Sequence, residues 1–456
     1  MNFMNDTIAA ISTPTGLGAI SIVRVSGEDA IKVVNSLFQG ADLQKVPTQT
    51  MHYGHFTTKN GEVIDEVLVS VMRAPKTYTK EDIVEVNCHG GPYVTQKVLS
   101  TILGSKVRMA EAGEFTKRAF LNGRIDLTEA EAVMDLINAK TMLQERTAVD
   151  MVDGALSKMI GSLRESMIQV IANAEVNIDY PEYDEEEVTR TKMKETTEQV
   201  IKELRSVIDY SENGKVLKSG IKTAIVGAPN VGKSSLLNLL YRGNRAIVTE
   251  IPGTTRDTLE EEITIGQLVL DLIDTAGIHQ TDDIIEKLGI EKSHQMIDRA
   301  DLVLLVLDGS RDLTTEEIQL LEDTASRERI IIINKNDLPQ KIDLNQLGVD
   351  LNEVLRISAL NGDGFKSLQD KIEGLFLNGI ENSNGAVLLA NARQLGLLNQ
   401  TEESLKSVLE GLESEIPLDI VLIDFNEAWK SLGEIIGENA PDELVNELFS
   451  RFCVGK

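Results

Sequence analysis

Residues Gly227-Ala228-Pro229-Asn230-Val231-Gly232-Lys233-Ser234 match G-x4-G-K-S, the pattern of loops that hold nucleotide phosphates. An apolar run at 221–226 predicts a buried strand before the loop, and 235–240 predicts the start of a helix after it. Glycines allow the tight turn that brings backbone N–H groups together, and the helix N-terminus adds partial positive charge. We expect Lys233 to contact the β and γ phosphates and the Ser234 hydroxyl to bind Mg²⁺.

Three further motifs follow in order, each at the end of a predicted strand. They are Asp274-Thr275-Ala276-Gly277, Asn334-Lys335-Asn336-Asp337 and Ser358-Ala359-Leu360. Asp274 can hold the magnesium shell, and the Gly277 N–H can contact the γ phosphate. An aspartate at 337 accepts hydrogen bonds from guanine N1–H and its N2 amino group, which adenine cannot offer, and 358–360 backs the base. The four motifs predict a GTPase domain with in-line attack of water on the γ phosphate.

The position after D-T-A-G departs from small signalling GTPases, which often carry glutamine there. Here it is Ile278, which cannot orient a water molecule. Another group must therefore position water and neutralise charge. Asn230 and the segment 249–257 are the candidates.

Composition limits the class of protein. The chain has 456 residues, which suggests about three domains. With 45 Lys+Arg against 73 Asp+Glu, its formal net charge is −28, which argues against coating nucleic acid by charge alone. Cys88 and Cys453 form neither a disulfide framework nor a zinc pattern. We see no signal peptide and no membrane span, and expect a cytoplasmic protein.

The hydrophobic pattern divides the chain into three parts. Residues 1–121 predict a mixed α+β domain with strands at 8–11, 20–25, 63–72 and 83–86, helices at 30–38 and 93–103, and a polar corner at 87–91. Residues 122–219 and 380–456 predict one discontinuous helical domain, with a stripe over 156–178 that ends at Tyr180-Pro181. Residues 220–379 predict an inserted Ras-like domain with a mostly parallel sheet. Linkers are expected at 211–214 and 379–385.

Further stretches carry a family resemblance. The phosphate loop with Pro252-Gly253-Thr254-Thr255-Arg256-Asp257 resembles the TrmE–Era-like GTPases. The full chain resembles the MnmE (TrmE) family of tRNA modification GTPases, through 85–91, 113–127 and the terminal Phe452-Cys453-Val454-Gly455-Lys456.

The resemblance assigns cations to the nucleotide site. It implies a potassium ion held by Asn230, Thr249, Ile251 and Thr254, and Mg²⁺ held by Ser234 and Thr255. It makes Glu286 the residue that orients the attacking water. Arg256 could be an arginine finger, but we expect a structural or switch-stabilising role for it, because potassium already fills the role of the finger. The GTP-contacting set becomes Asn230, Val231, Gly232, Lys233, Ser234, Ser235, Thr249, Glu250, Ile251, Pro252, Gly253, Thr254, Thr255, Asp274, Thr275, Ala276, Gly277, Asn334, Lys335, Asp337, Ser358, Ala359 and Leu360.

The resemblance also assigns the N-terminal domain to dimerisation and to tetrahydrofolate, as the 5,10-methylene or 5-formyl form. Folate contacts fall on Arg24, Glu85, Arg124 and Lys456, and either Arg or Lys at position 124 can pair with a folate carboxylate. Cys453 is a candidate catalytic residue, with a small buried apolar role as the equal alternative.

The implied activity is modification of C5 of the wobble uridine in certain tRNAs. The group added is an aminomethyl or carboxymethylaminomethyl group, and the work is done by a homodimer with the FAD-dependent partner MnmG. GTP and potassium pair the GTPase domains. One alternative is an Era- or Der-like ribosome-assembly switch, which would carry a basic RNA-binding domain. Another is a dimerising scaffold whose GTPase only times assembly.

Overall fold

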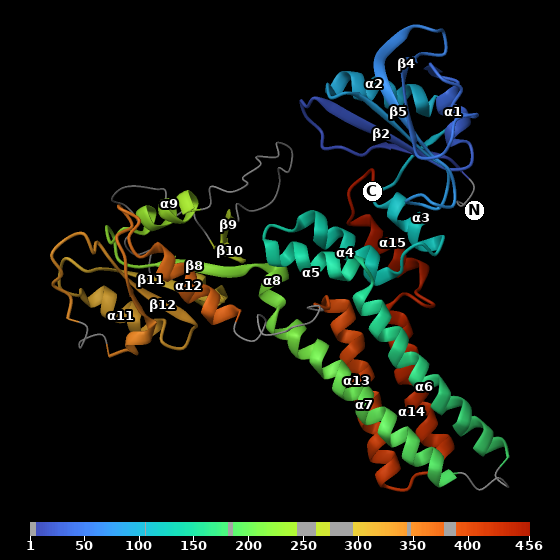
Figure 1. The fold of residues 1–456 in the computed structure, drawn as a ribbon. Helices are drawn as coiled ribbons and strands as arrows, with labels where there is room; N and C mark the ends of the chain where they lie inside the picture. Colours follow the sequence, from blue (N-terminus) through green and yellow to red (C-terminus); the bar gives the residue numbers. More distant parts are fainter. Residues whose placement is uncertain are drawn as a thin grey trace. The chain divides into compact units, whose positions relative to one another are not determined.

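The computed structural model describes residues 6–104, 106–180, 186–243, 261–273, 295–343, 348–377 and 389–456. The chain forms two compact units, each built from separate stretches (Figure 1). The first comprises Met1–Met134, Met151–Ile201 and Gly396–Lys456, and the second comprises Asp135–Asp150 and Lys202–Leu395. The three-domain boundaries at 121, 219 and 379 stay a prediction.

The first unit contains a seven-stranded sheet in the order β3-β4-β5-β6-β2-β1-β7. Alternate strand residues face helices α1 (Ala30–Asn35) and α2 (Pro92–Leu103), and together they form one buried core. The strands are β1 (Ile8–Ile11), β2 (Ile20–Ser26), β3 (Phe38–Gln39), β4 (Thr50–Thr57), β5 (Val63–Met72), β6 (Ile83–His89) and β7 (Arg108–Met109).

Local predictions for this sheet were right in type but incomplete. The helix predicted over 30–38 ends at Asn35, because Phe38 and Gln39 pair with β4 instead. Strand β4 itself was not predicted. The polar corner predicted at 87–91 was wrong in part, because β6 continues through Asn87, Cys88 and His89 in register with β2.

The rest of the first unit is helical. Its long helix α6 (Ala155–Asp179) runs beside α14 (Leu418–Ile435) in Figure 1. Arg164 of α6 stacks on the Trp429 ring at 4.1 Å. Helix α6 ends directly before Tyr180-Pro181, as the proline predicts. The other helices are α3 (Glu114–Leu121), α4 (Leu127–Asn138), α7 (Glu186–Asn213), α13 (Ala392–Glu413) and α15 (Asp442–Ser450).

The linker predicted at 211–214 was wrong. Helix α7 continues to Asn213, and Ser211 is buried within it. Its hydroxyl donates to the Val207 carbonyl at 2.7 Å and accepts from the Ala390 N–H at 2.9 Å. The buried serine is tolerated in the helix because its hydroxyl accepts the hydrogen bond of a backbone N–H from another segment. The second predicted linker, 379–385, lies outside the described residues.

The second unit has a six-stranded sheet in the order β13-β12-β11-β8-β10-β9. All its pairings are parallel except β9 with β10, and buried clusters cover both faces, as the alternating pattern predicted. Its strands are β8 (Ile221–Val226), β9 (Glu261–Ile265), β10 (Leu268–Leu272), β11 (Leu302–Asp308), β12 (Arg329–Asn334) and β13 (Val354–Arg356). Its helices are α8 (Lys215–Ser219), α9 (Lys233–Gly243), α11 (Thr315–Asp323), α12 (Phe365–Phe376) and the short 3₁₀ helix η5 (Leu351–Glu353).

Helix α5 (Met142–Val152) explains why residues 135–150 group with this sheet. Leu143 packs against the sheet's core, and its N–H donates to the Gln267 side chain at 3.2 Å. Lys140 pairs with Glu262 of β9. This end of α5 therefore holds the β9–β10 hairpin, which lies between the segments 249–257 and 274–277 in sequence.

Candidate functional site

The phosphate loop joins the C-terminal end of β8 to the start of α9, the arrangement that its sequence predicted. Two of its glycines are required by the backbone. Gly227 has φ +155° and a side chain there would overlap the Val306 carbonyl, whereas Gly232 has φ +104° and abuts the Asn334 amide. Asn230 also adopts a left-handed φ of 62° and its side chain is exposed. The loop is thus wrapped tightly around the start of α9.

Lys233 folds back onto this loop. Its Nζ donates to the carbonyls of Gly227 at 2.7 Å and Ala228 at 2.8 Å. Burial lowers the pKa of this ammonium, and the charge of Glu316 opposes that change. Phosphate oxygens would give the ammonium stronger acceptors than two carbonyls. Ser234 and Ser235 are exposed in the first turn of α9, where the Ser234 hydroxyl was predicted.

Asn334 connects the phosphate loop to the loop at 358–360. It ends β12 and is 3% exposed. Its Nδ2 donates to the Val231 carbonyl at 2.9 Å, and its Oδ1 accepts from the Ala359 N–H at 2.9 Å. One buried amide therefore brings three of the four predicted motifs into one site.

Asp337 lies exposed at the rim of the same site. Its Oδ1 accepts a hydrogen bond from the Ser358 hydroxyl at 2.5 Å, which orients the carboxylate. Lys335, with φ 64°, sends its ammonium to Asp308 at the end of β11, 2.6 Å away. Burial alone would raise the pKa of the Asp308 carboxyl, but hydrogen bonds from Lys335 and Ser310 outweigh it and lower the pKa. Leu360 is exposed beside them.

Several predicted nucleotide residues lie outside the described residues. They are Thr249, Glu250, Ile251, Pro252, Gly253, Thr254, Thr255, Arg256, Asp274, Thr275, Ala276, Gly277, Ile278 and Glu286.

A second site forms in the first unit around Arg24. Arg24 and Glu85 stand opposite each other on β2 and β6, and the guanidinium pairs with the carboxylate at 2.8 Å. Arg24 NH1 also donates to the Gly455 carbonyl at 3.4 Å. Gly455 has φ +98° and a side chain there would overlap the Ile11 carbonyl, so glycine lets the tail lie against β1.

The other residues predicted to contact folate lie around the same arginine. Lys456 ends the docked tail, and burial together with repulsion from Arg24 lowers its pKa, which Cys453 partly offsets. Exposed Arg124 lies over the Tyr78 ring at 4.7 Å, and Arg24 lies near that ring at 5.8 Å. Cys453 is exposed, so the buried apolar role is wrong; its carbonyl accepts from the Gly113 N–H at 3.3 Å.

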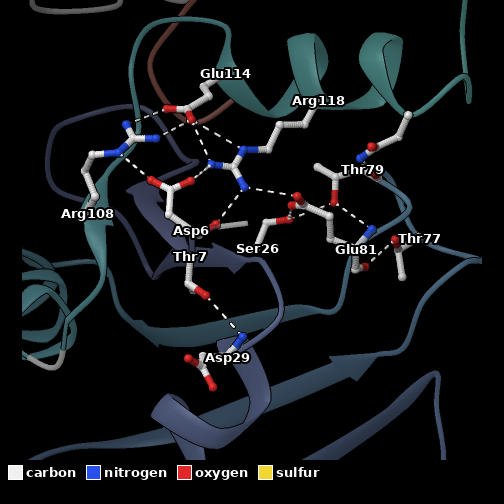
Figure 2. Close-up of polar contacts among 11 residues, drawn as sticks. Asp6, Thr7, Ser26, Asp29, Thr77, Thr79, Glu81, Arg108, Glu114 and Arg118 are labelled. Carbon is white, nitrogen blue, oxygen red and sulfur yellow. Dashed lines mark hydrogen bonds and ion pairs between the residues drawn. The ribbon is translucent and has the colours of Figure 1, made fainter. Parts of the chain in front are cut away.

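A partly buried ion-pair network next to this site was not predicted. Figure 2 shows Arg118 between Glu114 and Asp6, with Arg108 bonded to both carboxylates and Glu81 on the other side. Burial would raise the pKa of Asp6 and Glu114, but the arginines lower both. The sequence pattern at 113–127 indicated the family. It did not indicate which carboxylates pair with Arg118, because two of them lie far away in sequence.

The network forms one wall of a cavity of about 700 Å³ between α3 and α15. The charged groups of the network bond to each other, and Lys117 donates to the Asn446 side chain at 2.6 Å. The cavity therefore has no set of free donors that selects a ligand class.

The family models match nearly the whole chain. The GTP-binding protein TrmE N-terminus matches residues 7–124, and the MnmE helical domain matches 127–453. The tRNA modification GTPase MnmE of Lactobacillus delbrueckii subsp. bulgaricus is 55% identical over 99% of this chain and 98% of its own. The chain belongs to the MnmE family.

Two further comparisons are with a second relative and with a solved structure. MnmE of Lactobacillus acidophilus is 53% identical over 99% of this chain and 98% of its own. The solved G domain of the T. maritima FeoB iron transporter is 29% identical over 33% of this chain and 96% of its own, with a TM-score of 0.25. Because the MnmE relatives match along the full length, the Era- or Der-like alternative is not retained. Among the described helices, none is both long and apolar enough to cross a bilayer.

Proposed function

We propose that this MnmE-family chain hydrolyses GTP at the site formed by its phosphate loop and base-recognition loops. The observation that carries the proposal is Asn334, whose amide bonds to both Val231 and Ala359. With the loops held together, a nucleotide can place its phosphates at Lys233 and its guanine at Asp337. Specificity would follow because an ionised carboxylate only accepts hydrogen bonds, and guanine offers two donors.

Catalysis would come from positioning and charge neutralisation. Lys233 would exchange its loop carbonyls for β and γ phosphate oxygens. Glu286 would orient the attacking water, because Ile278 has no polar group. Both lie outside the described residues, so their roles rest on the sequence resemblance.

The described oxygen donors fit the proposed cations. The exposed Ser234 hydroxyl at the start of α9 suits Mg²⁺, which prefers oxygen ligands, with Thr255 as its companion. The exposed Asn230 side chain offers an amide oxygen for potassium, with Thr249, Ile251 and Thr254 completing the set. Together the cations would supply positive charge beside the phosphates.

We further propose that Arg24, Glu85, Arg124 and Lys456 bind a tetrahydrofolate. The three cations suit its carboxylates, and Glu85 can accept hydrogen bonds from its pterin N–H groups. The support is that Arg24 contacts Glu85, the Gly455 carbonyl next to Lys456, and the ring over which Arg124 lies.

The biological task proposed is modification of the wobble uridine at C5, with MnmG as partner and folate as the one-carbon source. A homodimer is supported by apolar side chains on the sheet face opposite α1 and α2. Met51, Tyr53 and Leu68 are 59%, 62% and 40% exposed there. GTP-dependent pairing of the second units would then time the reaction.

The test is a tRNA nucleoside profile from cells that lack the gene, complemented with wild type, Asp337→Asn or Arg24→Ala. We expect the wobble modification to return only with wild type. A normal profile without the gene would refute the tRNA task.

Cys453→Ser tests whether Cys453 takes part in the chemistry or the protein acts only as a dimerising scaffold. Full tRNA modification by this variant, with its GTPase activity intact, would favour the scaffold. Glu286→Ala should lose turnover while keeping nucleotide affinity.

A further inference from the structure

Tyr78 lies between the two arginines of the proposed folate site. Cζ of Arg124 is 4.7 Å from its ring centroid, and Cζ of Arg24 is 5.8 Å away. Both distances fall within the ~6 Å over which a cation is attracted to an aromatic ring. Two guanidinium groups repel each other, so a shared ring offsets part of that repulsion.

Arg124 depends on this ring more than Arg24 does. Arg24 already has Glu85 as a carboxylate partner at 2.8 Å, and it also lies 5.7 Å from the Phe115 ring. Arg124 is exposed; Glu129 interacts with its charge electrostatically, and its guanidinium lies over the ring of Tyr78. Its guanidinium is thus oriented by a ring while its N–H groups stay available to an anion.

Hydrogen bonds hold the segment that follows Tyr78, and one more holds the Tyr78 hydroxyl. The Thr79 and Ser26 hydroxyls lie 2.7 Å apart, and Ser26 donates to Glu81, which pairs with buried Arg118 (Figure 2). The Tyr78 hydroxyl lies 2.9 Å from that of Thr116, which is fully buried.

The same loop holds the turn that carries Arg124. The Lys80 ammonium donates to the carbonyls of Asn122 at 3.0 Å and Gly123 at 2.8 Å. The Asn122 side chain donates back to the Thr79 carbonyl at 2.6 Å. Ring and guanidinium are therefore positioned by one set of bonds.

We propose that Tyr78 is a positioning residue for tetrahydrofolate binding, whose ring holds Arg24 and Arg124 at the separation that receives the anionic ligand. This inference rests on the folate site proposed above. Its role belongs to the ring, and the hydroxyl serves mainly to seat that ring against Thr116.

The experiment titrates 5-formyl-tetrahydrofolate into the full-length protein by calorimetry. Tyr78→Leu should weaken binding about tenfold, because two cation–π contacts are lost, while Tyr78→Phe should stay within about threefold of wild type. Tyr93→Leu, which replaces an exposed tyrosine of α2, is the control and should bind as wild type. Trp429 fluorescence on heating checks folding of the first unit, and the GTPase rate checks the second. If Tyr78→Leu unfolds, Tyr78→Met replaces it.

The outcomes separate the two proposals. Wild-type affinity in Tyr78→Leu, with weakened binding in Arg24→Ala and Arg124→Ala, would overturn the role of Tyr78 and leave the folate site standing. An equal loss in Tyr78→Phe would also overturn it, because the ring would then not be what matters. Absence of binding by the wild-type protein would reject the folate site itself, and the Tyr78 inference with it.

Discussion

The Asn334 amide donates to the Val231 carbonyl across 2.9 Å, so the end of strand β12 directly holds the loop between β8 and α9. Asn334→Ala would leave that carbonyl and the Ala359 N–H buried without a partner, at a cost of about 1–3 kcal/mol each. We expect GDP and GTP affinity to fall about 10- to 100-fold together. Titration with a fluorescent guanine nucleotide measures this loss.

Asn361→Ala is the matched control, because its side chain is exposed in the neighbouring loop. It should bind nucleotide normally. Unchanged affinity in Asn334→Ala would show that the two loops hold their places without this amide.

Asp337→Asn should exchange guanine for xanthine as the preferred base. The amide that replaces the carboxylate donates where guanine also donates, whereas xanthine offers an acceptor. GTP affinity should fall about 10- to 100-fold and XTP affinity should rise, measured by competition binding. Retention of the guanine preference would mean that Asp337 does not contact the base.

GTP hydrolysis should be faster in KCl than in NaCl. An arginine finger contributes about 10³- to 10⁵-fold in other GTPases, and we expect potassium to contribute at least about tenfold here. Asn230→Ala should remove the difference between the salts, while Asn238→Ala, an exposed residue of α9, should keep it. Equal rates in both salts for the wild type would remove the potassium assignment.

The Arg118 network should make the first unit sensitive to acid. The folded-state pKa values of Asp6 and Glu114 lie below their ordinary values of 3.8 and 4.5. Their contribution is therefore present above those ordinary values and is lost as pH falls through the lower folded-state values. The free energy of unfolding should begin to decline below about pH 5 and continue to decline until the pH has passed the folded-state pKa values. Trp429, the chain's single tryptophan, lies in this unit and reports its unfolding.

Arg118→Met tests whether the network causes this decline of the unfolding free energy at low pH. It leaves Glu81 without its arginine, and Asp6 and Glu114 with Arg108 alone, so it should cost about 3 kcal/mol at neutral pH, with a flatter acid limb. Arg451→Met removes an exposed pair with Glu447 and should cost at most about 1 kcal/mol. An acid limb as steep as that of the wild type in Arg118→Met would assign the pH dependence to other groups.

Local patterns predicted the phosphate loop and the parallel sheet well, because each depends on residues close in sequence. Asn334 was placed in the right motif, but its bond to Val231 crosses from β12 to the loop after β8, which no spacing reveals. Strand β4 was not predicted because residues 50–57 are half exposed and mix polar with apolar side chains. The prediction of a linker at Ser211 failed because this serine is held in helix α7 partly by a hydrogen bond from the Ala390 N–H, which is far along the chain. Tyr78 belongs to no sequence motif, and its position between Arg24 and Arg124 is evident only in the three-dimensional structure.

The borders between the two units fall at 134/135, 150/151, 201/202 and 395/396, inside helices α4, α5, α7 and α13. At each of the four borders the chain therefore continues from one unit into the other as hydrogen-bonded helical backbone, and none of these passages is a loop.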